Sequence, residues 1–278
     1  MSNAPIATPR SFTAISRARS DFPRPPMLTR RAALRLATGA AVIAAAYGSA
    51  AGLRRLLEPD LKFEPIAALP GFRRLAGGPA SAGDLVFAGL DGAQQIALPR
   101  EALCTQLFST ARPDVPQIAY FGDSRCVYCR VVSPLLQRLD REQAAEITWH
   151  ELPLLGQASV IAARAALAAR AQGAYDFFHH SMMGSPILPT PHYLSNLSQK
   201  AGIDPKRLLQ DMKTSAVTQE LATTAALARR FGFIGTPALV VGRTAVLGRV
   251  DRRLLTRLIA AERAAPDPAP CAGSAQSG

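Results

Sequence analysis

The stretch Cys126-Val127-Tyr128-Cys129 decides the fold of this chain, because of what stands on either side of it. Before it, the run Gln117-Ile118-Ala119-Tyr120-Phe121 has the length and apolar content of a buried strand. After it, apolar residues recur at helical spacing, namely Val131, Leu135, Leu136 and Leu139. The two cysteines are therefore expected at the start of a helix that follows a strand.

This position of the pair favours redox chemistry. Unpaired N–H groups and the helix dipole at a helix N-terminus stabilise a thiolate, and the second cysteine lies one turn further on. Haem attachment requires histidine directly after the pair, where the chain has Arg130. A zinc knuckle requires a second ligand pair, whereas Cys104 and Cys271 are single and far apart. Metal binding by the pair and an inert structural disulfide stay open as alternatives.

The charge of the chain does not indicate a nucleic-acid-binding protein. The formal net charge is +12 over 278 residues. Residues 1–50 contain seven arginines against one aspartate, which is half of the excess. The other basic residues are scattered in short pairs such as Arg54-Arg55 and Arg252-Arg253, as on a solvated surface.

The N-terminal part resembles an export segment. Residues 29–35 are basic, and the run from Ala37 to Leu53 carries no charge before Arg54-Arg55 ends it. The adjacent arginines after threonine resemble a twin-arginine signal, in which Ala33 replaces a bulkier residue. An uncleaved membrane anchor at residues 37–53 is the alternative to a cleaved signal peptide. Both interpretations place the rest of the chain outside the cytoplasm, in the periplasm or an equivalent compartment.

The flanking regions have simpler patterns. Residues 1–26 are rich in proline and arginine and are predicted to be disordered, so 1–55 form a disordered N-terminus plus signal or anchor. Residues 56–114 are predicted to be an extension, loop-like over 56–82. It continues with a hairpin around Asp91-Gly92 and a short helix from Pro99 to about Ser109. The tail 264–278 is predicted to be disordered.

The core is predicted as an α/β domain over residues 115–263. A strand at 117–121, a helix at 126–141 and a strand at 147–152 form a βαβ unit with parallel strands. Helices are expected at about 158–172, 174–183, 191–201, 205–212 and 217–231. A hairpin then joins strands at 238–241 and 244–247, and Asp251 caps a last helix that ends near Arg263.

This order of elements resembles the thioredoxin fold with an inserted α-helical domain that DsbA-like thiol–disulfide oxidoreductases have. The resemblance covers about residues 115–263, with the helical insertion at about 158–231. Its specific pieces are Phe121-Gly122-Asp123 before the cysteine pair, Glu151-Leu152-Pro153-Leu154-Leu155-Gly156 before an alanine-rich helix, and Gly235-Thr236-Pro237 before an apolar strand.

The resemblance implies a role for each matching residue. Cys126 corresponds to the attacking thiol and Cys129 to the resolving thiol. Pro237 corresponds to a cis-proline that faces the pair, and the main chain of Thr236 then pairs with a substrate segment as an added strand. Asp123 either relays protons for Cys129 or, like Ser124, caps the helix.

The sequence therefore predicts an exported thiol–disulfide oxidoreductase that acts on cysteine-containing exported proteins without a metal or organic cofactor. A membrane redox partner is expected to reset the pair. Val127 and Tyr128 stand where strong oxidants of this family often have proline or histidine, so the direction of electron flow stays open. A metallochaperone that binds a soft metal through the same cysteines is the rival function, and a chaperone-like domain is a third.

Two smaller features have competing interpretations. His179-His180 with Met182-Met183 suggests copper binding, but on an amphipathic helix beside Phe177-Phe178 we interpret it as packing and a solvated face. Cys104 and Cys271 form either a second, structural disulfide, free thiols or an intermolecular bridge.

Overall fold

The computed structural model describes residues 60–75, 81–82, 98–99, 101–108, 115–267 and 269–271. Contacts divide the chain after Asp60, and the description concerns the unit Leu61–Gly278. The described residues do not include the predicted disordered N-terminus or the export segment. They also do not include the predicted hairpin around Asp91-Gly92, apart from its last residue. Within the described part, no helix combines the length and the apolar character that crossing a membrane requires.

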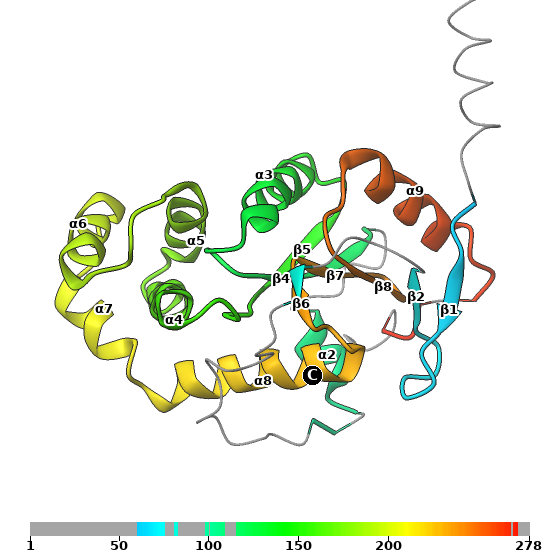
Figure 1. Cartoon of the computed structure of the whole chain (residues 1–278), viewed down its shortest axis with the longest axis horizontal. Helices are drawn as coiled ribbons and strands as arrows, with labels where there is room; N and C mark the ends of the chain where they lie inside the picture. Colours follow the sequence, from blue (N-terminus) through cyan, green and yellow to red (C-terminus); the bar gives the residue numbers. More distant parts are fainter. Residues whose placement is uncertain are drawn as a thin grey trace, which may run out of the picture. The chain divides into compact units, whose positions relative to one another are not determined.

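A mixed sheet of six strands forms the centre of the domain (Figure 1), in the order β1-β2-β8-β7-β4-β5. Its strands are β1 (Phe63–Pro65), β2 (Arg73–Leu75), β4 (Gln117–Gly122), β5 (Glu146–Glu151), β7 (Ala238–Val241) and β8 (Thr244–Leu247). Strands β4 and β5 are parallel and are joined by α3 (Val127–Arg141), which confirms the predicted βαβ unit. Strand β7 is antiparallel to β4 and to β8, as the predicted hairpin requires.

Different helices cover the two faces of the sheet. Helices α3 and α9 (Arg252–Arg263) lie on one face, and α2 (Leu103–Leu107) and α8 (Ser215–Phe231) lie on the other (Figure 1). Successive side chains of a strand point to opposite faces, so β4 contributes to both cores. Ile118 and Tyr120 join the core under α3 and α9, whereas Ala119 and Phe121 join the core that includes α8.

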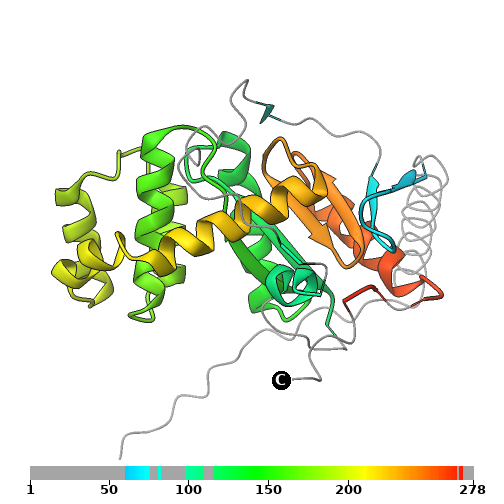
Figure 2. The ribbon, with the colours of Figure 1, turned by 90° about the horizontal axis from the view of Figure 1, so that it is seen from below.

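The inserted helical domain stands between β5 and β6 (Gly235–Thr236) in the chain. It consists of α4 (Gln157–Arg170), α5 (Tyr175–Gly184), α6 (Pro191–Ala201), α7 (Pro205–Asp211) and the first part of α8. The side chains of Thr190, Asp204 and Thr214 accept hydrogen bonds from main-chain N–H groups at the starts of α6, α7 and α8. Figure 2 shows α8 running from this helical group to the sheet. The predicted fold class and the helices of the core are confirmed, with boundaries that differ by at most two residues, whereas the short helix predicted from Pro99 begins at Leu103.

The extension before the core contains strands that the sequence did not reveal. Residues 56–82 are predicted to be loop, but β1 and β2 form an antiparallel pair, and β2 runs parallel to β8 at the edge of the sheet. A further short strand, β3 (Ser81–Ala82), pairs antiparallel with β6. Strands of two or three residues are too short to show the alternation of a strand in the sequence. Their pairing depends on tertiary contacts.

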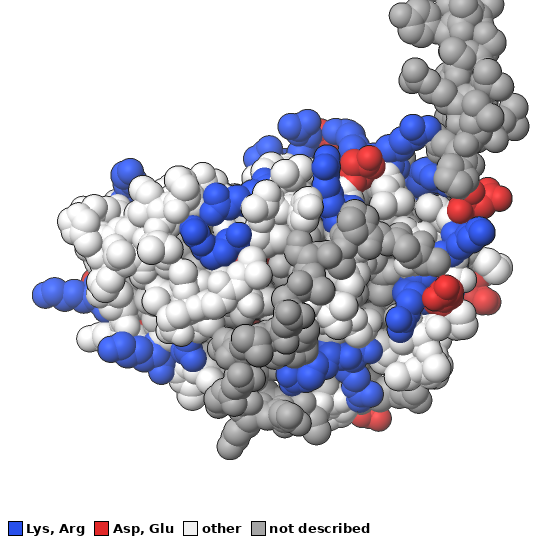
Figure 3. Space-filling view, viewed as in Figure 1, with Lys and Arg blue, Asp and Glu red and all other residues white. Residues whose placement is uncertain are grey.

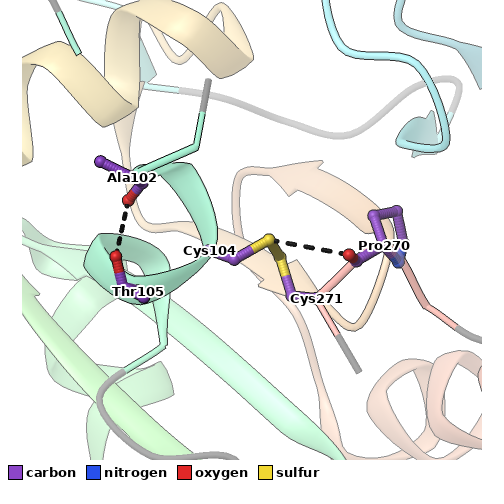
Figure 4. The surroundings of a disulfide bond; sticks show 5 residues. All are labelled: Ala102, Cys104, Thr105, Pro270 and Cys271. Carbon is purple, nitrogen blue, oxygen red and sulfur yellow. Dashed lines mark hydrogen bonds between the residues drawn. A yellow bond between two sulfur atoms is a disulfide. The ribbon is translucent and has the colours of Figure 1, made fainter. Parts of the chain in front are cut away.

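The C-terminal segment is tied to the extension by a disulfide. Cys104 on α2 bonds to Cys271, which lies 167 residues further along the chain and is buried (Figure 4). This selects one of the three states that the sequence left open. Of the segment predicted to be a disordered tail, residues 264–267 and 269–271 are described, and the Arg243 guanidinium donates a hydrogen bond to the carbonyl of Asp267.

Candidate functional site

The cysteine pair lies at the N-terminus of α3, as predicted. Cys126 has an extended conformation and is the N-cap of the helix, because its sulfur accepts a hydrogen bond from the main-chain N–H of Cys129 at 3.3 Å. The expectation that Asp123 or Ser124 caps this helix is therefore wrong. Both cysteines are free thiols and both are buried, with 2 % of Cys126 and 0 % of Cys129 exposed.

The two thiols have opposite shifts in pKa. The pKa of Cys126 is lowered from 9.0 to about 6, first by the hydrogen bond from the Cys129 side chain, with further help from main-chain N–H groups at the helix start, although burial opposes the shift. Burial raises the pKa of Cys129 well above its usual value, and the neighbouring Cys126 adds to this rise. At neutral pH the arrangement therefore favours a thiolate on Cys126 and a protonated Cys129.

The loop before β7 brings Thr236 and Pro237 to this pair. The peptide bond between them is cis, as the resemblance implies. The Cys126 thiol donates a hydrogen bond to the main-chain carbonyl of Thr236 at 3.3 Å, across 110 positions of sequence. Thr236 is buried, and it forms β6 together with Gly235.

Asp123 is a buried carboxylate beside the pair, between β4 and α3. Its main-chain N–H lies 3.5 Å from the Cys129 sulfur, to which it donates a weak hydrogen bond. Its side chain accepts four hydrogen bonds, from the N–H groups of Arg125 (2.8 Å), Leu154 (2.8 Å) and Leu155 (3.0 Å) and from the hydroxyl of Ser159 (2.7 Å). Burial raises the pKa of Asp123, and these hydrogen bonds oppose the rise. The carboxylate thus holds the chain after β5 against the cysteine loop.

Two residues of the site escaped the sequence analysis. The Tyr120 hydroxyl donates a hydrogen bond to the carbonyl of Cys129 at 3.4 Å, and burial raises the pKa of Tyr120 well above its usual value. Ser159 binds Asp123 from α4. Ser159 is the only residue with a hydroxyl group in the alanine-rich stretch 157–170, and this was a usable signal. Tyr120 gave none, because tyrosine in a buried strand is an ordinary core residue.

Arginine side chains connect the cysteine loop to the helical insertion. Arg125 donates to the carbonyl of Pro186 at 3.2 Å, and Arg130 donates to the carbonyl of Ser185 at 2.9 Å. Arg130 also donates to the carbonyl of Ser124 at 3.2 Å. The segment after α5 is therefore fixed against the start of α3.

A buried polar chain joins α3, β5 and α5 below the pair. His179 contacts the Glu151 carboxylate through Nδ1 at 2.7 Å and the Ser133 hydroxyl through Nε2 at 3.2 Å. The Tyr175 hydroxyl donates to the same carboxylate at 2.9 Å. All four side chains are buried, so His179 has a structural environment in agreement with the packing interpretation. Among the described residues, no group of three or more His, Cys, Asp or Glu is placed to hold a metal ion.

The surface around the covered thiols is apolar. Large side chains are exposed next to the pair at Val127 (73 %), Val131 (52 %) and Tyr128 (39 %), and before β6 at Ile234 (48 %). On the face that Figure 3 shows, lysine and arginine side chains occur in several separate groups, as expected for a solvated surface. Exposed apolar side chains therefore stand next to the buried thiols in the sequence and before β6.

Known proteins share the fold of this chain. Residues 117–260 match the family described as "DSBA-like thioredoxin domain". Among solved structures, a thioredoxin-like oxidoreductase from Silicibacter pomeroyi DSS-3 is 34 % identical, with a TM-score of 0.53, and the match covers 58 % of this chain and 97 % of that one. No curated protein matches the chain.

Two further structures show the fold at lower identity. The thiol-disulfide exchange protein alpha-DsbA2 from Wolbachia pipientis is 22 % identical with a TM-score of 0.52, over 58 % of this chain and 94 % of that one. A periplasmic thioredoxin-like protein from Salmonella enterica serovar Typhimurium is 24 % identical with a TM-score of 0.52, over 62 % and 100 %.

The family match spans more than half of the chain, so the chain belongs to the DsbA-like thioredoxin domain family. It is a thiol–disulfide oxidoreductase of that class.

Proposed function

We propose that this oxidoreductase exchanges disulfides with cysteine-containing proteins outside the cytoplasm through Cys126 and Cys129. The Cys126 thiolate attacks one sulfur of a substrate disulfide, which forms a mixed disulfide and releases the other substrate sulfur as a thiolate. Cys129 then loses its proton and attacks the Cys126 sulfur. This step releases the second substrate sulfur and leaves a disulfide between Cys126 and Cys129. The reverse sequence transfers a disulfide to a dithiol substrate.

The separation of the two pKa values is the observation that carries this proposal. A pKa of about 6 makes Cys126 a thiolate at neutral pH, and the raised pKa of Cys129 keeps the resolving thiol protonated until the first step is complete. Asp123 supports the same order of events, because its main-chain N–H donates a hydrogen bond to the Cys129 sulfur. We assign to Asp123 the positioning of that sulfur and the removal of its proton.

Thr236 and Pro237 are proposed to bind the substrate main chain. The main chain of Thr236 borders the Cys126 sulfur, with its carbonyl 3.3 Å from that atom. An extended substrate segment that pairs with this edge would place its own sulfur next to Cys126, and such strand addition supplies affinity through main-chain hydrogen bonds. The exposed apolar side chains Val127, Val131 and Ile234 would contact the substrate side chains.

Export from the cytoplasm is supported by two independent features. The basic residues 29–35 followed by the uncharged run 37–53 have the organisation of an export signal or anchor. The disulfide between Cys104 and Cys271 belongs to a class of bond that persists in oxidising compartments. In such a compartment a membrane redox partner is needed to return the Cys126–Cys129 pair to its working state after each exchange.

Substrate trapping tests the proposal. In the Cys129→Ser variant the resolving thiol is absent, so a mixed disulfide between Cys126 and a substrate cysteine accumulates and is detected by mass spectrometry of non-reduced protein. The matched Cys126→Ser variant is expected to trap nothing.

Failure of the Cys129→Ser variant to form mixed disulfides with any exported cysteine protein would count against the proposed function. Stoichiometric copper or zinc in the reduced wild-type protein, without exchange activity, would favour the metallochaperone instead.

A further inference from the structure

The edge of β6 that borders Cys126 already carries a strand of the same chain. Ser81 of β3 is paired with Thr236, and Ala82 is paired with Gly235, in antiparallel register. Thr236 is also the residue whose carbonyl accepts the hydrogen bond from the Cys126 thiol. The extension before the core therefore uses the same main-chain edge that is assigned above to a substrate segment.

The exposure of the site agrees with an occupied edge. Cys126 is 2 % exposed and Thr236 is 2 % exposed, although the neighbouring Val127 is 73 % exposed. A nucleophilic sulfur that is covered in this way cannot reach a substrate disulfide until a neighbouring segment moves. Strand β3 is held beside Thr236, the neighbour of this sulfur, by a pairing of two residues.

Fixed points on both sides of β3 in the sequence keep it close to this edge. Before it, β2 is paired with β8, and Arg73 donates hydrogen bonds to Thr244 at 2.8 Å and to Glu262 at 3.0 Å. After it, the carbonyl of Leu98 accepts a hydrogen bond from Arg230 at 2.7 Å. A segment tethered at both ends has a high effective concentration at its docking edge, so a weak pairing is sufficient to compete with a free peptide.

We propose that residues 81–82 are an internal occupant of the β6 edge, which a cysteine-containing polypeptide displaces before Cys126 attacks its disulfide. The inference rests on the proposed function, because it assumes that substrates pair with Thr236. It adds a requirement to that function, namely that a substrate offers an extended segment able to replace the main-chain pairing of β3. The protein then reacts slowly with disulfides in folded regions that cannot form a strand.

Proline substitutions in β3 test this competition. Neighbouring residues of an antiparallel pair alternate between hydrogen-bonded and non-hydrogen-bonded positions, so one of Ser81→Pro and Ala82→Pro removes a cross-strand donor and the other is its matched control. The probe is a short unstructured peptide with one disulfide, reacted with reduced full-length protein. We expect one variant to react about fivefold to tenfold faster than wild type, the size of one lost hydrogen bond.

The outcomes of this experiment separate the two proposals. If wild type reacts and both proline variants react at the wild-type rate or more slowly, the internal occupant is refuted and the proposed function stands. If wild type does not reduce the peptide disulfide at all, the proposed function itself fails.

A crosslink tests the same pairing without proline, in case the substitutions disturb folding. The Ser81→Cys and Ala82→Cys changes are each combined with Cys129→Ser and treated with oxidised glutathione. The new thiol and Cys126 each lose one hydrogen to form an internal disulfide, and oxidised glutathione is reduced to two molecules of glutathione. We expect the crosslink in one of the two, while a control with Thr256→Cys on the exposed side of α9 forms none. Absence of the crosslink at both positions would refute the pairing.

Discussion

The chain contains two pairs of cysteines that the fold uses in opposite ways. Cys126 and Cys129 are separated by two residues, lie at the start of α3 and are free thiols. Cys104 and Cys271 are separated by 167 positions and form a closed disulfide between α2 and the C-terminal segment. The same residue type therefore supplies the proposed exchange pair in one region and connects distant parts of the chain in the other.

The difference in separation along the chain explains the difference in use. A crosslink stabilises a protein mainly by restricting the unfolded chain, and this effect grows with the length of the closed loop. A bond between Cys126 and Cys129 closes almost no loop, so it can form and break while the domain stays folded. A bond between Cys104 and Cys271 closes most of the domain, so its loss affects the stability of the whole domain.

Replacement of the attacking thiol should lower the rate of disulfide exchange more than any other change considered. Serine is not ionised at neutral pH, so the Cys126→Ser variant should reduce a peptide disulfide about a thousandfold more slowly than wild type, or not measurably. The matched Cys104→Ser variant, with its partner alkylated, should keep the wild-type rate within about twofold. Equal losses in the two variants would remove the functional distinction between the pairs.

The free energy of unfolding should depend on the two cysteine pairs in the opposite way to the exchange rate. The double change Cys104→Ser with Cys271→Ser should lower the free energy of unfolding by about 2–5 kcal/mol, because the unfolded chain regains its loop entropy. The double change Cys126→Ser with Cys129→Ser should alter it by much less. Urea unfolding followed by circular dichroism measures both. A larger loss in the Cys126 and Cys129 variant would contradict the comparison.

The sequence was sufficient for the parts of the fold that have long periodic patterns. The strand at 117–121, the helix after it, the helices of the insertion and the last helix were predicted, because apolar spacing and a cap such as Asp251 are local signals. The contact between Cys126 and Thr236 was implied by the family resemblance alone. No local pattern in the sequence connects residues that are 110 positions apart.

The remaining parts depend on contacts that no local pattern records. Strands β1, β2 and β3 are too short for a period, and the role of Ser81 depends only on main-chain pairing. Three of the four hydrogen-bond donors to the Asp123 carboxylate lie more than 30 residues later in the chain, so the sequence suggested only a helix cap. The disulfide between Cys104 and Cys271 was one of three states that the sequence allowed, because sequence alone does not determine the pairing of distant cysteines.

The reactivity of Cys126 should depend on pH in a way that reports its pKa. With a pKa of about 6, Cys126 in the reduced protein should react with iodoacetamide at a rate that is lost as pH falls through about 6. Above about pH 7 the rate should be nearly constant, because the thiolate is then fully formed. Mass spectrometry of the modified peptide measures the rate at each pH.

The hydrogen bond from Cys129 is the main cause of this low pKa, so the Cys129→Ala variant should shift the midpoint upward toward the ordinary cysteine value of about 8.5. Cys129→Ser keeps a hydroxyl donor and is expected to shift it less. A midpoint near 8.5 in the wild type would instead remove the electrostatic basis of the proposed order of attack.

The smallest predicted effect concerns a polar connection that also holds the extension to the sheet. The Glu262 carboxylate on α9 accepts hydrogen bonds from Arg73 on β2 (3.0 Å), from the Thr244 hydroxyl (2.6 Å) and from the Arg243 side chain (3.2 Å). The Glu262→Gln change keeps the shape but removes the charge that two guanidinium groups share. It should therefore lower the free energy of unfolding by about 1–3 kcal/mol.

The Glu262→Gln variant should leave the pH midpoint of Cys126 unchanged, because none of these contacts reaches α3. The exchange rate should also stay unchanged, because the pairing of β2 with β8 still fixes the chain before β3. Urea unfolding, the peptide-disulfide assay and the iodoacetamide profile measure the three quantities on one protein. A change in the midpoint would mean that the connection of β2 to α9 also adjusts the redox pair. In that case the contacts that stabilise the chain around Glu262 would also influence the exchange chemistry at Cys126.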